Sequence, residues 1–236
     1  MRKKTDDLVS GVRGQIDFLA GLGVDFVVPP GVREEEPARS RSPRQSPQAD
    51  SELYGSLRDE ILQCRSCPLC ESRTHVVPGE GDIQADLMFV GEGPGHDEDV
   101  QGRPFVGRAG QLLTKIIAAM KYERPEVYIT NVVKCRPPEN RVPHGEEIEA
   151  CFPFLLRQIE IVRPKVIVTL GKVAADVFVP NTSAMTRLRG RFYDFRGIRV
   201  RPTFHPAYLI RNEGNRELKR MVWIDMQEVM AVLGKK

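Results

Sequence analysis

Residues 87–107 read LMFVGEGPGHDEDVQGRPFVG, in which a short apolar run ends at a loop rich in glycine and acidic residues. Three more apolar runs follow along the chain, and stretches with helical patterning separate all four. The later runs are 127–130, 166–170 and 198–204, and the helical stretches are 110–120, 146–162, 172–178 and 217–233. Short buried strands that alternate with helices are typical of a parallel sheet covered on both faces. The sequence therefore predicts an α/β fold, a three-layer α/β/α sandwich around a mostly parallel four-stranded sheet.

The composition is that of an ordinary globular protein. The chain has 236 residues, 41% hydrophobic and 28% charged, which excludes collagens, disulfide-rich toxins and coiled coils. No apolar stretch approaches the roughly 20 residues that a membrane-spanning helix needs. The charged N-terminus lacks the apolar region of a signal peptide, so we expect a cytoplasmic protein. The net charge of +3 is too small to indicate a nucleic-acid partner by itself.

The first 50 residues differ from the rest of the chain. Residues 5–22 fit a short helix, and residues 29–50 form a linker of proline, serine and alternating charge that leaves little to bury. We expect residues 1–50 to be an extension with a disordered linker, whose helix is a candidate for recruiting a protein partner. Residues 51–236 are expected to form the functional domain, acting as a monomer.

Polar residues lie at the carboxyl ends of three predicted strands. Glu92 follows the first strand, Asn131 ends the second, and His205 follows the fourth. In open α/β sheets ligands bind outside the carboxyl ends of the strands. The sequence therefore predicts that a carboxylate, an amide and an imidazole meet at one edge of the sheet.

The glycine-rich loop after the first strand admits several interpretations. Its glycines let backbone N–H groups approach a ligand, as in nucleotide-binding loops, although a plain tight turn is also compatible. The segment is not G-x-G-x-x-G, and no Gly-Lys-Ser/Thr follows it. Asp97, Glu98 and Asp99 would repel phosphates, which favours a site of another kind.

The five cysteines indicate a metal or cluster site. Disulfides are rare in the reducing cytosol, and Cys64 and Cys67 form a C-x2-C pair. Cys135 and Cys151, much later in the chain, complete a possible four-thiolate set; the alternative is that both are small buried apolar residues. Zinc and iron–sulfur clusters both accept four thiolates, so the spacing leaves the choice open.

Arginines are frequent in the C-terminal third, between residues 187 and 201, and aromatic residues lie among them. This stretch fits either a solvated strand face or a surface that grips phosphates. The turn His205–Leu209 combines a rigid proline with apolar tips, and cations follow it. Such a turn fits a wedge that enters a DNA duplex.

Taken together, these motifs resemble family 4 uracil-DNA glycosylases, the iron–sulfur type of bacteria and archaea. The resemblance covers about residues 62–233 and leaves residues 1–50 outside. It rests on the early C-x2-C pair, GEGPG and GRPFVGRAGQLL, YITNVVKCRPPENR, the later Cys151, VIVTLG and FHPAYLIRN. The fold implied is the uracil-DNA glycosylase-like α/β/α sandwich.

The resemblance also implies roles for individual residues. The ligands of a [4Fe–4S] cluster would be Cys64, Cys67, Cys135 and Cys151, with Cys70 a free thiol. Glu92 would lie beside the scissile bond, with Gly93 near the base, and Glu98 near C5 of uracil. Phe105 would stack on the base, Asn131 would read its edge, and His205 would supply the catalytic imidazole. The loop that probes the DNA would contain Pro206, Tyr208, Leu209 and Arg211.

The implied activity is hydrolysis of the N-glycosidic bond of deoxyuridine in DNA, which releases uracil and leaves an abasic site for base excision repair. Uracil-containing DNA is thus the expected partner. Two other functions share some of the same residues: a non-catalytic iron–sulfur DNA-binding module and a zinc-stabilised nucleotide hydrolase. Only the glycosylase requires Glu92, Asn131 and His205 around one pyrimidine.

Overall fold

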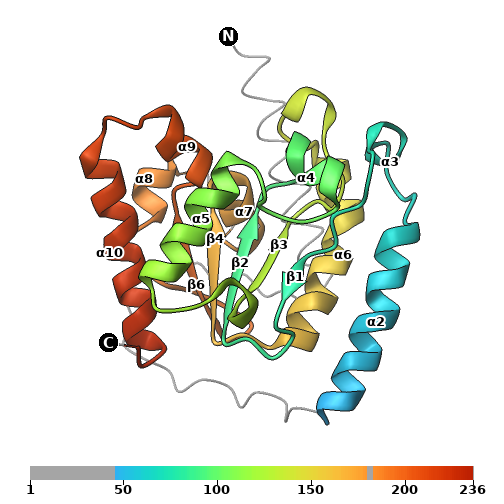
Figure 1. Cartoon of the computed structure of the whole chain (residues 1–236), viewed down its shortest axis with the longest axis horizontal. Coiled ribbons are helices and arrows are strands. Elements are labelled where there is room, and N and C mark those ends of the chain that lie inside the picture. The colour runs from blue at the N-terminus through green and yellow to red at the C-terminus, as the bar shows by residue number, and fades with distance from the viewer. Residues whose placement is uncertain (1–45, 180–182, 236) are drawn as a thin grey trace. The chain divides into compact units, whose positions relative to one another are not determined.

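The computed structural model describes residues 46–179 and 183–235 (Figure 1). The helix expected at residues 5–22, and the expected linker up to residue 45, lie outside these ranges. In the part described, no helix is long and apolar enough to cross a membrane.

A six-stranded sheet forms the centre, in the order β1-β3-β2-β4-β6-β5. The four inner strands run parallel, as predicted: β3 (Tyr128–Asn131), β2 (Leu87–Gly91), β4 (Val166–Leu170) and β6 (Ile198–Thr203). The predicted count of four was too small, because antiparallel β1 (Glu80–Gly81) and β5 (Tyr193–Phe195) add one strand at each edge. Both are very short and mostly unburied, so neither produces an apolar run in the sequence.

Helices cover both faces of this sheet, which confirms the three-layer sandwich (Figure 1). On one face α5 (Arg108–Ala119) and α10 (Arg216–Val232) share a core with β2 and β4, in which Leu113, Val168 and Val229 are buried. Strand β3 lies on one side of β2 in the sheet, and β4 and β6 lie on the other side. The connection from β2 to β3 therefore runs in the opposite direction to the connections from β3 to β4 and from β4 to β6. Because all are right-handed, α6 (Gly145–Val162) and α7 (Lys172–Phe178) lie on the other face. All four helices begin and end within two residues of the predicted bounds.

The first described helix begins earlier than predicted. Helix α2 (Pro47–Gln63) starts four residues before the expected Ser51, within the segment assigned to the linker. The Ser46 side chain accepts a hydrogen bond from the Ala49 N–H at 3.3 Å, and Pro47 occupies the first turn. Serine as N-cap followed by proline is a favourable helix start, and this local signal outweighs the polar composition of the segment.

Three short helices lie in the connections between the larger elements. They are α3 (Leu69–Ser72), α4 (His96–Gln101) and α8 (Met185–Leu188), with two 3₁₀ turns at Arg124–Glu126 and Pro138–Asn140. A further helix, α9 (Pro206–Arg211), replaces the loop expected at these residues. The chain there has a proline at the first helical position and a capping side chain just before it, so it folds into helical turns.

Candidate active site

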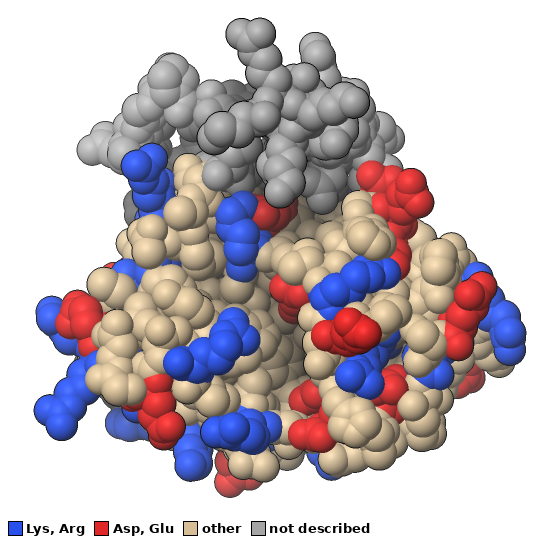
Figure 2. Space-filling model, turned by 90° about the horizontal axis from the view of Figure 1, so that it is seen from above, with Lys and Arg blue, Asp and Glu red and all other residues tan. Residues whose placement is uncertain are grey.

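A pocket of about 760 Å³ opens at the carboxyl ends of the parallel strands. Glu92 from the end of β2, Asn131 from β3, Gly171 after β4 and His205 after β6 all line it. Figure 2 looks onto this end of the molecule and shows a hollow near its middle, with Lys and Arg side chains on both sides. The three side chains that the sequence assigned to one edge of the sheet therefore share one cavity.

Glu92 projects from the loop directly after β2. Desolvation by burial raises the pKa of its carboxyl group above the ordinary value. A partly desolvated carboxylate interacts more strongly with a nearby positive charge than one in water does. Gly93, the next residue, also lines the pocket, and a Cβ there would lie 2.7 Å from Cγ2 of Val133. The chain approaches closely at this point, which favours glycine.

Asn131 ends β3 with its side chain enclosed, at 1% exposure. Its Oδ1 atom is buried and makes no hydrogen bond with any residue that the structure describes. Leaving a buried carbonyl unpaired costs roughly 1–3 kcal/mol, so such an atom usually has a functional reason. Asn131 also lines the pocket, so its carboxamide lies where the edge of a ligand could be read.

His205 is the N-cap of α9 and its protonation state follows from that position. Its Nδ1 accepts a hydrogen bond from the Ala207 N–H at 3.1 Å, so in the neutral ring the proton is on Nε2. Burial, and then the positive charge of Arg211, lower the pKa of His205 to about 4. The imidazole is therefore neutral near pH 7 and presents a single N–H donor.

Phe105 forms an aromatic wall beside this histidine. The two ring centroids are 5.7 Å apart with the planes tilted by 31°. Phe105 has a φ of 51°, in the left-handed region that non-glycine residues rarely adopt. A Cβ on Gly91 would lie 2.5 Å from Cζ of the Phe105 ring, so glycine at position 91 makes room for the ring.

Glu98 holds the Phe105 loop in this conformation. Its Oε1 accepts hydrogen bonds from the N–H groups of Val106 at 2.8 Å and Gly107 at 2.9 Å, and its Oε2 accepts one from Gly95 at 3.2 Å. Glu98 also lines the pocket, as predicted. The sequence did not indicate that its carboxylate would be engaged by backbone donors on both oxygens.

The residues expected to probe DNA divide into two groups on α9. Tyr208 is 40% exposed, and Tyr208 and Arg211 line the pocket. Leu209 is 3% exposed and belongs to the core, and Pro206 is buried at the start of the helix. That Leu209 and Pro206 contact DNA stays a prediction, and in the free protein only Tyr208 and Arg211 of this set are exposed. A helix turns successive side chains by about 100°, which points Leu209 inward where Tyr208 points outward.

The arginine-rich stretch is also divided by burial. Arg187, Arg191 and Arg199 are exposed, but Arg201 is fully buried and Arg189 is mostly buried. Both bind Asp225 of α10 at 2.8 Å, and Asp225 also accepts a 2.7 Å hydrogen bond from Thr203. Part of the positive charge that suggested phosphate binding therefore serves to join α10 to β6.

Several pocket residues had not been predicted. They include Lys172, the segment Ala184–Thr186, and Pro137, Asn140, Arg141 and Val142. Lys172 lies two residues after the carboxyl end of β4, and this position alone could have predicted it as a pocket residue. Met185 begins the four-residue helix α8, and Val142, which is 60% exposed, is an isolated apolar residue in a loop. No sequence pattern points to either residue.

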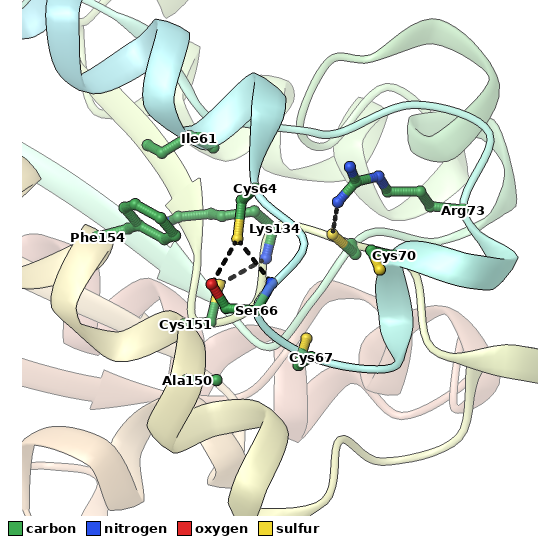
Figure 3. Close-up of a pocket in the computed structure, with 11 residues that line it drawn as sticks. Ile61, Cys64, Ser66, Cys67, Cys70, Arg73, Lys134, Ala150, Cys151 and Phe154 are labelled. Atoms are coloured by element: carbon green, nitrogen blue, oxygen red, sulfur yellow. Dashed lines mark hydrogen bonds between the residues drawn. The ribbon is translucent and has the colours of Figure 1, made fainter.

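The cysteines gather in a second, smaller pocket (Figure 3). Cys64 caps the end of α2, Cys67 and Cys70 flank the start of α3, Cys135 follows β3, and Cys151 lies on α6. Ile61 and Phe154 supply apolar walls. The four predicted ligands thus come together from separate parts of the chain, and Cys70, expected to be a free thiol, lines the same pocket.

Nitrogen donors surround these thiols. The Arg73 guanidinium donates to Sγ of Cys135 at 3.1 Å, and the Lys134 backbone N–H donates to Sγ of Cys151 at 3.3 Å. Burial raises the pKa of Cys135, and it raises the pKa of Cys151 to about 12. Among the residues described, no three His, Cys, Asp or Glu side chains converge closely enough to hold a single metal ion.

Comparison with known proteins identifies the family to which this chain is similar. Residues 78–227 match the family model of the uracil DNA glycosylase superfamily. The chain is 49% identical to a type-4 uracil-DNA glycosylase of Thermotoga maritima, over 78% of this chain and 96% of the relative. It is 47% identical to one of Sulfurisphaera tokodaii, over 69% and 78%, and 42% identical to one of Archaeoglobus fulgidus, over 75% and 92%.

Proposed function

Since this chain belongs to the type-4 branch of the uracil-DNA glycosylase superfamily, we propose that it hydrolyses the N-glycosidic bond of deoxyuridine in DNA. The products are free uracil and an abasic site, the first intermediate of base excision repair. One observation carries the proposal: Glu92, Asn131 and His205 line a single pocket at the carboxyl ends of the strands. We further propose that the enzyme works as a monomer in the cytoplasm.

Recognition of uracil follows from the Asn131 carboxamide. A base inside the duplex is unreachable, so the nucleotide must first leave the stack. Uracil presents an N3–H donor and an O4 acceptor, which pair with Oδ1 and Nδ2 of the amide. Cytosine offers the reverse pattern and would leave Oδ1 unpaired, as it is in the free protein. Phe105 then stacks on the extruded ring.

Thymine differs from uracil only by the methyl group at C5, so a rigid wall must exclude it. We assign this wall to Glu98, whose carboxylate cannot easily move because backbone N–H groups hold both oxygens. The same contacts fix the Phe105 loop. A steric block of this kind discriminates by repulsion and adds no attractive contact to uracil.

Bond cleavage leaves negative charge on uracil and positive charge on the sugar. The Nε2–H of neutral His205 donates to O2 of the departing base, and backbone N–H groups near Gly93 add to this stabilisation. The Glu92 carboxylate stabilises the sugar cation and orients the attacking water. Placing these charges in a partly desolvated pocket strengthens both effects.

We propose that Cys64, Cys67, Cys135 and Cys151 hold a [4Fe–4S] cluster. Four thiols around one pocket match the ligand set of such a cluster, which takes one thiolate at each iron. When bound, the cluster cross-links the segments that carry these cysteines. Thiolate ligation then makes the folding of this region depend on iron.

Tyr208 is the side chain that we propose as the wedge in the duplex, since it is exposed at the pocket rim. It would fill the space left by the extruded nucleotide and offset the few kcal/mol that extrusion costs. Arg211, on the same rim, would contact the neighbouring phosphates.

The test uses an oligonucleotide with one uracil, treated with protein and then with alkali. Removal of the base produces strand cleavage at that site, whereas a DNA-binding module produces none. A variant with both Glu92→Gln and His205→Ser is the matched control for contaminating activity. Wild-type protein that cleaves no more than this double variant would exclude the proposed function. Brown protein with broad visible absorbance supports iron–sulfur, and colourless, iron-free active protein would exclude it.

A further inference from the structure

The ammonium group of Lys134 is enclosed within the protein. Lys134 is 2% exposed and lies between β3 and Cys135. Its Nζ donates to the Asn131 carbonyl at 2.6 Å, to Oγ1 of Thr130 at 2.8 Å and to Oε1 of Gln158 at 2.7 Å. The three N–H donors thus have three uncharged oxygen acceptors. Within the described residues, no carboxylate pairs with this cation.

A buried charge of this kind requires an explanation. Taking an ammonium group out of water is expensive, and apolar residues of similar volume usually stabilise a core as well or better. Apolar packing therefore does not explain Lys134, and the three buried oxygens that its ammonium group bonds point to a positional task. The shortest of its contacts is to the main chain of Asn131, the residue whose unpaired Oδ1 lies at the pocket.

Lys134 also belongs to a network that reaches other elements. Gln158 of α6, which accepts from Nζ, donates to the Pro78 carbonyl at 2.7 Å and to the Tyr128 hydroxyl at 3.0 Å. The backbone N–H of Lys134 donates to Sγ of Cys151, also on α6. Lys134 thereby joins the end of β3 to α6 and to the cysteine pocket that it lines (Figure 3).

We propose that Lys134 is a positioning residue for uracil recognition. Its ammonium group fixes the main chain of Asn131 and so aims the carboxamide into the pocket. This inference rests on the proposed function, because it gives Asn131 the task of reading uracil. The alternative is that Lys134 only stabilises the core, in which case its removal would lower the melting temperature and leave uracil affinity unchanged.

Lys134→Met tests this, because methionine has a similar length and no N–H donor. The expected result is a KM for a uracil oligonucleotide that rises about tenfold, with kcat changed less than about twofold. The reason is that Asn131 contacts the base in both the ground and the transition states. Free uracil, followed by NMR titration, should bind about tenfold more weakly. The concentration of enzyme that carries the cluster is determined from its iron content and visible absorbance.

Tyr128→Phe is the matched control from the same network. It removes a buried hydroxyl that bonds Gln158 and Tyr54, each at 3.0 Å, but touches neither Lys134 nor the Asn131 carbonyl. It should lower the melting temperature and leave KM and uracil binding unchanged. If Lys134→Met does not fold, Lys134→Gln, which keeps an amide donor, takes its place with a smaller expected loss of affinity.

A double-mutant cycle with Asn131→Ala decides the outcome. If Lys134 acts through Asn131, adding Lys134→Met to Asn131→Ala should weaken uracil binding no further. An unchanged affinity in the single Lys134 variant, or full additivity in the double variant, would overturn the inference while wild-type excision still supports the proposed function. Wild-type protein without excision would overturn the proposed function, and this inference with it.

Discussion

At the scale of single residues, His205 performs two tasks with its two ring nitrogens. Nδ1 caps α9, which leaves the Nε2–H free for the donation to uracil that we propose. His205→Ser separates them, because a serine hydroxyl can cap the helix but is too short to reach the base. We expect α9 and the melting temperature at pH 7.5 to be preserved and single-turnover excision to fall by about 10²–10³-fold, the cost of one lost donor to a developing anion.

The low pKa of His205 predicts that the stability of the fold depends on pH. The pKa of His205 is about 4 in the folded protein and near 6.5 when unfolded, so the unfolded state binds more protons between these values. Stability from the neutral ring is therefore present above about pH 6.5 and lost as the pH falls towards 4. The melting temperature of wild type should drop more between pH 7.5 and 5 than that of His205→Ser. Equal drops in both would contradict the low pKa.

Glu98 gives a second prediction at this scale. Glu98→Ala removes both hydrogen bonds to the Phe105 loop and the one to Gly95, and we expect uracil excision to fall by at least about tenfold as that loop relaxes. Glu98→Gln keeps an oxygen for Val106 and Gly107, so it should retain most of the rate and still exclude thymine. Excision from uracil and thymine oligonucleotides measures both effects. A wild-type rate in Glu98→Ala would restrict Glu98 to a steric role.

At the scale of elements, α9 presents neighbouring residues to different surroundings. Tyr208→Ala should slow excision from double-stranded DNA and leave excision from single strands nearly unchanged, because only a duplex needs the gap filled. Leu209→Ala should destabilise the fold by about 2–5 kcal/mol and slow neither substrate selectively. Paired rate measurements and thermal melts distinguish the two. A duplex-specific defect in Leu209→Ala would mean that α9 unfolds on DNA.

Elements also show what the sequence could predict. The four inner strands were predictable because continuous apolar runs indicate strands that are buried on both faces, as β2 and β4 are. The edge strands β1 and β5 arise from pairing with a neighbour and leave no apolar run. Helix α9 was missed because six residues contain too few turns to show a helical period.

For the site, position at strand ends sufficed to predict Glu92, Asn131 and His205, since parallel strands end at one edge. The contacts of Glu98 with Val106 and of Lys134 with Gln158 were not predictable, because each joins segments that meet only in the folded chain.

At the scale of the whole molecule, the cysteine pocket joins α2, the α3 region, the end of β3 and α6. If Cys64, Cys67, Cys135 and Cys151 hold iron, replacing any one by serine should reduce visible absorbance and lower the melting temperature, since ligation stabilises the fold. Cys70→Ser is the matched control and should change neither. Full absorbance in Cys67→Ser together with its loss in Cys70→Ser would reassign the ligand.

The whole account depends on one pyrimidine fitting among side chains from β2, β3 and the start of α9. A crystal structure of the protein soaked with uracil measures this directly. We predict N3 of uracil within hydrogen-bond distance of Asn131 Oδ1, O2 within that distance of His205 Nε2, and the ring stacked on Phe105. Uracil bound outside this pocket, or bound within it without contact to Asn131 and His205, would contradict the account.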